Sequence, residues 1–438
     1  MRSVLTIVCV LLSINLSQGQ NSRIVTTDIN NFWNAYDHIN STTDTSKHYE
    51  YINELFLNKG TPGLKALMNV RNYTAKSYLD AIHQYPLFWR SIRANTLKAP
   101  KFATGIRRGI TQLKKLYAEL RPATIYFTIG ALRTSGTTQK DQILIGSELA
   151  LADQTSNTTE FSENLGHLKL FFESKPIQSV VFLNVHELVH TQQKTTVGNS
   201  LLAQCLLEGV AEFLAIHATG QASPTPALTY GPTHDQRIRA VFTNHMFSAS
   251  NRFWLYSNRT SEFGIRDLGY YVGYAICQQY YLKSANKRQA IKTMVELDYN
   301  DEQALNRFVD QSGYFQLSVK TLHTLYEKDR PKVTKVVEIE NLAADVDPGI
   351  RVITIEFSAP MNTSVRGFEF GPLGETAALR VKRFIAFSED GKSIKLEVEM
   401  KSSQRYQLLI SDGFEDMEGR SLIPYLIDFT TKAGDSPM

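Results

Sequence analysis

The most informative segment of this chain is Val181-Phe182-Leu183-Asn184-Val185-His186-Glu187-Leu188-Val189-His190, because it joins an apolar helical pattern to two histidines four residues apart. On a helix, His186 and His190 lie one above the other on the same face, where both imidazoles can reach a single metal ion. Zn²⁺ suits this ligand set because neutral imidazole binds it well. Glu187 is rotated by about 100° around the helix from His186, so its carboxylate can address a metal-bound water without occupying the metal.

Such a site needs a third protein ligand, and no further histidine lies close behind His190. A second helix, expected over residues 201–218, carries Glu208 and Glu212 within an apolar run. Burying an unpaired carboxylate costs several kcal/mol, so each needs a metal, a cation or strong donors. We predict Glu208 as the third zinc ligand and Glu212 as the acceptor that holds a ligating histidine by its other ring nitrogen. The alternative is a satisfied core histidine and a solvated stripe of glutamates.

Hydrolysis at this site would use a zinc-bound water whose proton Glu187 removes and later passes to the leaving amine. A donor for the developing oxyanion is also required. We nominate Tyr274, and Tyr270 second, from a helix expected within residues 266–281. A tyrosine stripe at helical spacing is also typical of a core.

These residues resemble a known group of enzymes. His186-Glu187-Leu188-Val189-His190 followed by Glu208-Gly209-Val210-Ala211-Glu212-Phe213 is similar to the gluzincin pattern of thermolysin-like and aminopeptidase-N-like enzymes, although Leu207 stands where that family often has Asn. The blocks at 186–193 and 269–274 resemble the predicted zinc-dependent proteases related to the gliding-motility lipoprotein B proteins of Bacteroidetes. This resemblance covers most of residues 28–327 and implies a zincin-like metallopeptidase domain in which a downstream glutamate completes the zinc site.

The predicted fold class is α+β. Residues 28–120 are helical in pattern, with aromatic residues at helix spacing that are expected to form a core. Short β-rich runs at 124–129 and 142–145 flank a polar turn-forming cluster at 134–138 and predict a small sheet, whose edge strand could accept an extended peptide. Helical patterns return over 176–327 and are interrupted by a polar stretch at 220–233.

The pattern changes again at Asp329-Arg330-Pro331. Beyond it, turn-punctuated strands predict a β-sandwich of immunoglobulin-like type. The segment also resembles the immunoglobulin-like modules of exported bacterial proteins, which act as spacers or adhesive units. The expected strands are 336–339, 350–357, 368–370, 381–387, 393–400, 406–410 and 425–429.

Residues 1–19 predict a secretory signal peptide, with Arg2 before an apolar run and small residues at the cleavage positions. The expected domains are therefore 1–19, a metallopeptidase domain at 20–329 and an immunoglobulin-like domain at 330–438. No later segment approaches the length of a membrane span, so we expect a secreted product. Cys205 and Cys277 could pair in an oxidising compartment or remain buried thiols.

The formal net charge of +4 predicts neither nucleic acid nor an anionic membrane surface as a partner, since it is small and the charges are expected to be evenly spread. Two classes of function stay open. The first is a secreted zinc metallopeptidase that hydrolyses peptide bonds of a peptide or protein substrate. The second is a non-catalytic cell-surface binding or adhesion protein that keeps a zincin-like fold and makes contact through the immunoglobulin-like domain.

Overall fold

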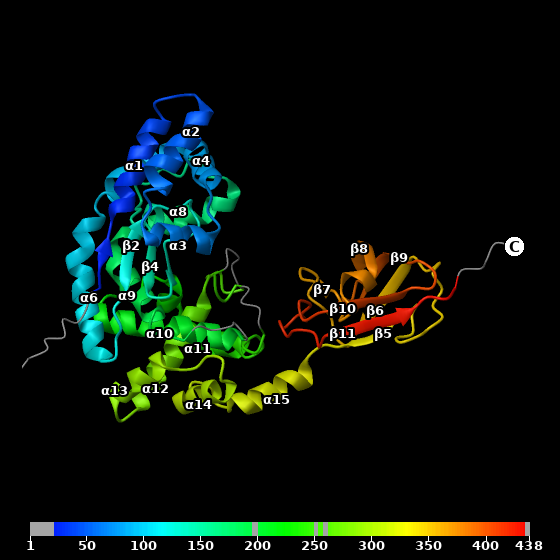
Figure 1. The fold of residues 1–438 in the computed structure, drawn as a ribbon. Coiled ribbons are helices and arrows are strands. Elements are labelled where there is room, and N and C mark those ends of the chain that lie inside the picture. Colours follow the sequence, from blue (N-terminus) through cyan, green and yellow to red (C-terminus); the bar gives the residue numbers. More distant parts are fainter. Residues whose placement is uncertain (1–21, 195–199, 249–252, 257–261, 434–438) are drawn as a thin grey trace, which may run out of the picture. The chain divides into compact units, whose positions relative to one another are not determined.

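The computed structural model describes residues 22–194, 200–248, 253–256 and 262–433 (Figure 1). The predicted signal peptide lies outside the described residues. The chain is α+β, with many helices and several small sheets. It divides into two compact units, residues 1–108 with 119–191 and residues 109–118 with 192–438.

The first unit begins with helices whose aromatic residues form its core, as the sequence predicts. Phe32 lies at the centre, with ring centroids 5.4 Å from Phe56 and 4.9 Å from Trp89, and all three side chains are fully buried. The elements are α1 (Thr27–Ile39), α2 (Thr45–Tyr51), the π-helix η1 (Ile52–Leu57), α3 (Pro62–Arg71), α4 (Ala75–Gln84), α5 (Pro86–Thr96), η2 (Ala99–Phe102) and α6 (Ala103–Leu116), of which α6 crosses from the first unit into the second.

A four-stranded sheet in the order β1-β2-β4-β3 positions the site in the first unit. Strands β1 (Ile24–Val25), β2 (Thr124–Thr128) and β4 (Gln142–Gly146) are parallel, and β3 (Gly136–Gln139) pairs antiparallel to β4 at the edge. The expected sheet is therefore present. The expectation of a turn over residues 134–138 is wrong in part, because residues 136–138 pair with residues 143–145 of β4 and leave only residues 134 and 135 outside the strand.

The rest of the first unit leads to the helix of the HExxH motif. After β4 come α7 (Ser147–Ala150), η3 (Glu163–Leu165), α8 (Gly166–Glu173), η4 (Pro176–Ser179) and α9 (Val180–His190). Helix α9 packs against β3 and β4. The motif therefore lies beside the edge of the sheet.

Helices of the second unit approach one another closely. A side chain at Gly209 of α10 (Leu201–Thr219) would collide with the backbone of Gly273 in α12 (Leu268–Lys283). By length and composition α10 could cross a membrane, but 78% of its apolar window is buried inside the protein, as in a core helix. The polar stretch expected at 220–233 ends early, because α11 (Pro226–Phe242) begins at Pro226 with a proline in its first turn, a position that a helix accepts. The remaining helices are α13 (Lys287–Val295), α14 (Glu302–Ser312) and α15 (Val319–Asp329).

The chain changes from helices to strands after α15, where the domain boundary is predicted. The strands form two antiparallel sheets, β5-β6-β9-β8 and β11-β10-β7, which share one hydrophobic core. They are β5 (Val333–Val336), β6 (Val352–Phe357), β7 (Phe368–Glu369), β8 (Arg380–Phe387), β9 (Ser393–Glu399), β10 (Arg405–Ile410) and β11 (Tyr425–Thr430), with the short helix η5 (Glu375–Ala377) between β7 and β8.

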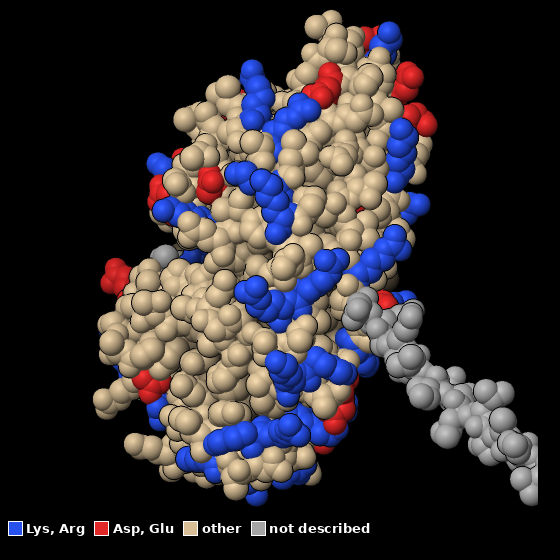
Figure 2. Space-filling view, turned by 90° about the vertical axis from the view of Figure 1, so that its left-hand side faces the viewer, with Lys and Arg blue, Asp and Glu red and all other residues tan. Residues whose placement is uncertain are grey.

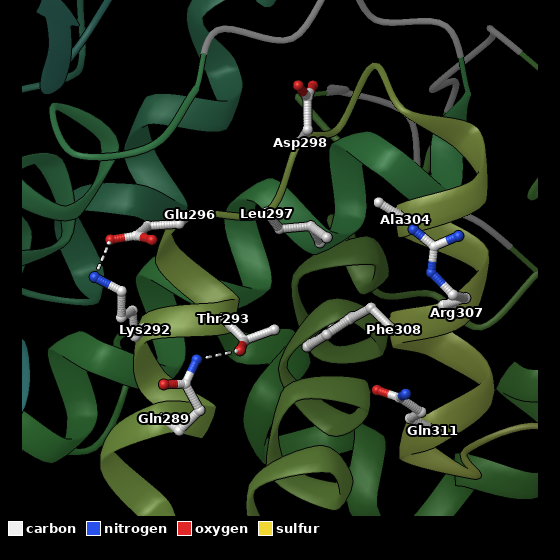
Figure 3. A pocket seen from close by; sticks show the side chains of 10 residues that line it. All are labelled: Gln289, Lys292, Thr293, Glu296, Leu297, Asp298, Ala304, Arg307, Phe308 and Gln311. Atoms are coloured by element: carbon white, nitrogen blue, oxygen red, sulfur yellow. Dashed lines mark hydrogen bonds and ion pairs between the residues drawn. The ribbon is translucent and has the colours of Figure 1, made fainter.

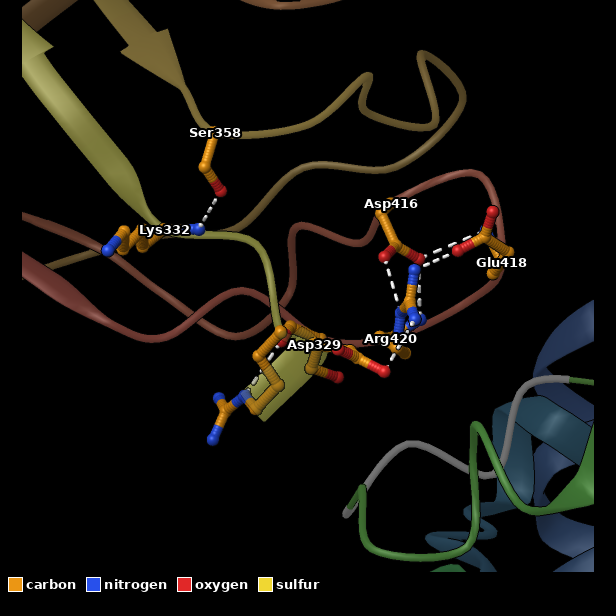
Figure 4. Close-up of polar contacts among 8 residues, drawn as sticks. Asp329, Lys332, Ser358, Asp416, Glu418 and Arg420 are labelled. Carbon is orange, nitrogen blue, oxygen red and sulfur yellow. Dashed lines mark hydrogen bonds and ion pairs between the residues drawn. The ribbon is translucent and has the colours of Figure 1, made fainter. Parts of the chain in front are cut away.

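A charged cluster connects α15 to a loop between β10 and β11 (Figure 4). Arg420 forms ion pairs with Asp416 at 2.7 Å, with Glu418, and with Asp329 at 3.7 Å. Nearby, the backbone N–H of Lys332 donates to the hydroxyl of Ser358 at 3.0 Å. These contacts hold the segment in which the helical part of the chain gives way to the strands.

Candidate metal centre

Helix α9 begins at Val180 and presents apolar residues around most of its circumference. Phe182, Val185, Leu188 and Val189 are almost completely buried, and the side-chain amide of Asn184 donates to the carbonyl of Val180 at 2.8 Å. Packing on several sides gives this helix little freedom to rotate. The histidines are therefore held in a set direction.

The structure brings the three predicted ligands together. His186, His190 and Glu208 each offer one ligand atom, and these atoms all lie within 4.8 Å of one another. The Nε2 atoms of the two histidines are 3.0 Å apart, and their rings are nearly perpendicular at 81°.

This donor set fits a divalent metal ion. Two bonds of ~2.0–2.1 Å from imidazole nitrogen to zinc, at a tetrahedral angle, would place the nitrogens about 3.3 Å apart. The 3.0 Å separation of the ring nitrogens is close to that value. Two nitrogens and one carboxylate oxygen also match the three-ligand sets of catalytic zinc sites, which keep the fourth position open.

Glu187 lies beside the edge strand. It is buried, and a side-chain carbon at Gly136 of β3 would come within 2.9 Å of its Oε1 atom. The glycine therefore lets the backbone of β3 pass close to the carboxylate. In the described sheet β3 has β4 as its neighbour and stands at the end of the strand order, so its other edge is not paired within that sheet.

Tyr256 is a candidate site residue that no sequence pattern indicates. Its hydroxyl donates to Oε1 of Glu208. Its backbone has a φ of 57°, a conformation that is uncommon for a bulky residue, and its side chain is 55% exposed. No motif or helical spacing relates it to Glu208, because 48 residues separate the two in the chain. Only the folded structure brings them into contact.

The two nominated tyrosines lie on α12. The ring of Tyr270 meets that of Tyr256 edge to face at 6.3 Å, and burial, followed by the charge of Glu208, raises its pKa well above the ordinary value. The ring of Tyr274 lies 6.1 Å from that of Phe213 on α10. Its pKa is raised by burial, then by Cys277 and Glu212. Tyr270 therefore lies in the same group of side chains as Glu208, and the role of Tyr274 as oxyanion donor stays a prediction.

Glu212 is buried on α10, one turn beyond Glu208. The hydroxyl of Thr225, just before α11, donates to its Oε1 atom at 3.3 Å. The predicted hydrogen bond from a ligating histidine stays a prediction. Cys205 and Cys277 are both buried free thiols and do not form a disulfide with each other.

Another buried carboxylate, that of Glu148, holds the loop that leads into β3. The backbone N–H groups of Gly130 and Leu132 donate to its two oxygens at 2.8 and 3.2 Å. Burial raises the pKa of Glu148 to about 7, although these hydrogen bonds oppose the shift. In the same loop, the backbone N–H of Arg133 donates to the hydroxyl of Tyr73 at 3.1 Å.

Two hollows of the second unit are lined by residues other than the predicted site residues. One, of about 360 Å³, lies between α13 and α14 (Figure 3). Lys292 forms an ion pair with Glu296 at its margin, at 3.0 Å. The other, of about 530 Å³, includes Leu202, Phe247 and His323 in its lining.

Comparison with known proteins identifies no family. No family model matches the chain, and no curated protein matches it. Among solved structures it is similar to domains 1-6 of the surface layer protein SbsC, with 14% identity and a TM-score of 0.19, over 75% of this chain and 45% of that chain. The N-terminal part of the bacterial S-layer protein SbsC matches with the same identity and TM-score, over 75% of this chain and 78% of that chain. The chain thus spans less than half the length of the first of these proteins, and a TM-score this low supports no conclusion about fold or function.

Proposed function

We infer that this chain is a zinc-dependent metallopeptidase that hydrolyses peptide bonds. The observation that carries this inference is the convergence of one ligand atom each from His186, His190 and Glu208 within 4.8 Å. A carboxylate adjacent in sequence to the first histidine, that of Glu187, supplies the base that such chemistry needs. The resemblance to the gluzincin pattern points the same way.

Bound at these ligands, Zn²⁺ would act as a Lewis acid toward a carbonyl and lower the pKa of a coordinated water toward about 7. The carboxylate of Glu187 accepts the proton of the attacking water and passes it to the leaving amine. The hydroxyl of Tyr256 donates to Glu208, which makes it our first candidate for the donor to the developing oxyanion. Tyr270 and Tyr274 are the second candidates for this donor.

The edge strand supports a peptide as the substrate. An extended chain can add to an open sheet edge through main-chain hydrogen bonds, and β3 ends the strand order of its sheet. Since Gly136 presents no side chain toward Glu187, a peptide paired along β3 would pass close to the base. In this proposal residues 20–329 are the zincin-like enzyme, and residues 330–438 are an immunoglobulin-like spacer of an exported protein.

The test combines metal content with cleavage. We expect the purified chain to contain about one zinc per molecule and to cleave members of a broad peptide library. Glu187→Gln should keep the zinc and lose about 10²–10⁴-fold in cleavage rate, because the general base is gone while the ligands remain. His190→Ala and Glu208→Ala should lose both zinc and cleavage.

Glu173→Gln is a matched control, because it removes an exposed carboxylate at the end of α8. It should leave zinc content and cleavage unchanged. Equal, slow cleavage by the wild type and Glu187→Gln would refute the enzymatic proposal even if zinc is bound. That result would favour the alternative of a binding protein.

A further inference from the structure

The exposed face of α6 carries an unusual concentration of positive charge. Residues 98–121 contain seven Lys or Arg residues and a single Glu, so their net charge of +6 exceeds the +4 of the whole chain. The expected even spread of charge therefore does not hold in this segment. Figure 2 views the face of the protein on which α6 lies, and shows Lys and Arg gathered on it with few acidic residues between them.

Helical geometry places these charges on one side of α6. At 100° per residue, Arg107, Arg108, Lys114 and Lys115 fall within an arc of about 120°, and all four are exposed. Ile106 and Leu113, on the opposite side, are buried in the core. The apolar side of the helix is therefore used in packing, and the basic side faces solvent.

The residue types on this face limit its partner. None of the large exposed apolar side chains of the described residues falls within α6, so the helix has no group to insert into a lipid core or to stack on a nucleic acid base. The two described hollows are lined by other elements. A straight basic helix about 21 Å long can lie along a flat anionic surface.

We propose that α6 docks this protein on the surface of a phospholipid bilayer rich in anionic headgroups. Clusters of about four to eight basic residues on a helix are typical of segments that bind anionic headgroups, and each Lys or Arg near the surface contributes about 1 kcal/mol. Attraction without insertion is reversible and strongly dependent on salt, since the screening length falls from about 10 Å at 0.1 M to about 3 Å at 1 M. This docking is independent of the proposed peptidase activity.

The experiment is cosedimentation of the full chain with lipid vesicles. We expect binding in 0.1 M NaCl to vesicles of phosphatidylcholine with about 30% phosphatidylglycerol, and no binding to phosphatidylcholine alone or in 1 M NaCl. Lys114→Glu with Lys115→Glu should weaken binding by about tenfold or more. Lys114→Gln with Lys115→Gln should weaken vesicle binding to a smaller extent. This neutral variant replaces the glutamate variant in the test if the glutamate variant does not fold.

Lys392→Glu with Lys395→Glu is the matched control, because it makes the same change in net charge at exposed positions near and in β9. It should bind as the wild type does. Equal loss in the control, or wild-type binding to phosphatidylcholine alone, would overturn the proposal. Tighter binding to a 20-base-pair DNA duplex than to the anionic vesicles would also overturn it and identify the face as a nucleic acid site.

Discussion

Glu148 should make the stability of the first unit depend on pH in a direction opposite to that of an ion-paired carboxylate. Its pKa rises from 4.5 in a model peptide to about 7 in the folded protein, because it is buried. One pKa unit corresponds to about 1.4 kcal/mol. Full ionisation of this one group therefore costs about 3 kcal/mol of folding free energy.

The sign follows from which state holds the proton. Below pH 4.5 both the folded and the unfolded chain have a protonated Glu148. Between 4.5 and about 7 the unfolded chain loses the proton while the folded chain keeps it, so the free energy of unfolding falls as pH rises. Above about 7 both states are ionised, and the loss is complete.

The variant Glu148→Gln isolates this contribution, because it stays neutral at every pH. We expect its free energy of unfolding to lack the fall between pH 5 and pH 8 that the wild type shows, a difference of about 2–3 kcal/mol. Urea unfolding followed by tryptophan fluorescence measures it. In a Trp254→Phe background the signal comes from Trp33 and Trp89, the two other tryptophans of the chain, which lie in the same unit as Glu148.

Comparing the variant with the wild type cancels the titration of other groups. At pH 5 or below, we expect the free energy of unfolding of the variant to be about 1 kcal/mol lower than that of the wild type. This difference comes from the effect of the amide on the hydrogen bonds of Gly130 and Leu132. Identical pH dependence in the two proteins would refute the assignment of a raised pKa to this carboxylate.

Three further predictions concern the site and its support. Gly136→Val should lower the cleavage rate by about tenfold or more while zinc content stays constant, because a side chain there meets Glu187 at 2.9 Å; an unchanged rate in a peptide cleavage assay would contradict the arrangement. Tyr256→Phe removes one hydrogen bond to Glu208 and should lower kcat more than it changes KM if the hydroxyl serves the transition state, with steady-state kinetics as the measurement and Tyr49→Phe as an exposed control. Gly209→Val should lower the free energy of unfolding by more than about 3 kcal/mol or prevent folding, since the valine side chain would collide with the backbone of α12. Thermal unfolding measures this effect, and wild-type stability of the variant would contradict the close contact of the two helices.

The proximity of His186, His190 and Glu208 is the part of the candidate site that sequence reasoning predicts best. The spacing of His186 and His190 depends only on the geometry of one helix, which is local. Glu208 was inferred from the cost of burying a carboxylate on an apolar helix, and the structure places its ligand atom within 4.8 Å of those of the histidines. Tyr256 could not be inferred in this way, because its contact with Glu208 depends on how a distant segment folds back.

Two errors have identifiable physical causes. The residues of β3 are polar and turn-forming in composition, but pairing with β4 satisfies their backbone groups, and tertiary context overrides the local preference. The net charge of the whole chain does not reveal the basic face of α6. The segment 98–121 has a net charge of +6, and acidic residues in other segments offset part of it in the total of +4. The net charge calculated over a sliding window of the sequence reveals this basic segment.

Local patterns are enough to predict the helix of the HExxH motif, the second helix with its two glutamates, and the change to strands after residue 329, because periodicity and spacing are properties of short segments. Packing in three dimensions sets which backbone passes beside Glu187, which hydroxyl reaches Glu208 and which carboxylate is buried deeply enough to keep its proton near neutral pH. Those features depend on contacts between segments far apart in the chain, and no local pattern encodes the distance between them.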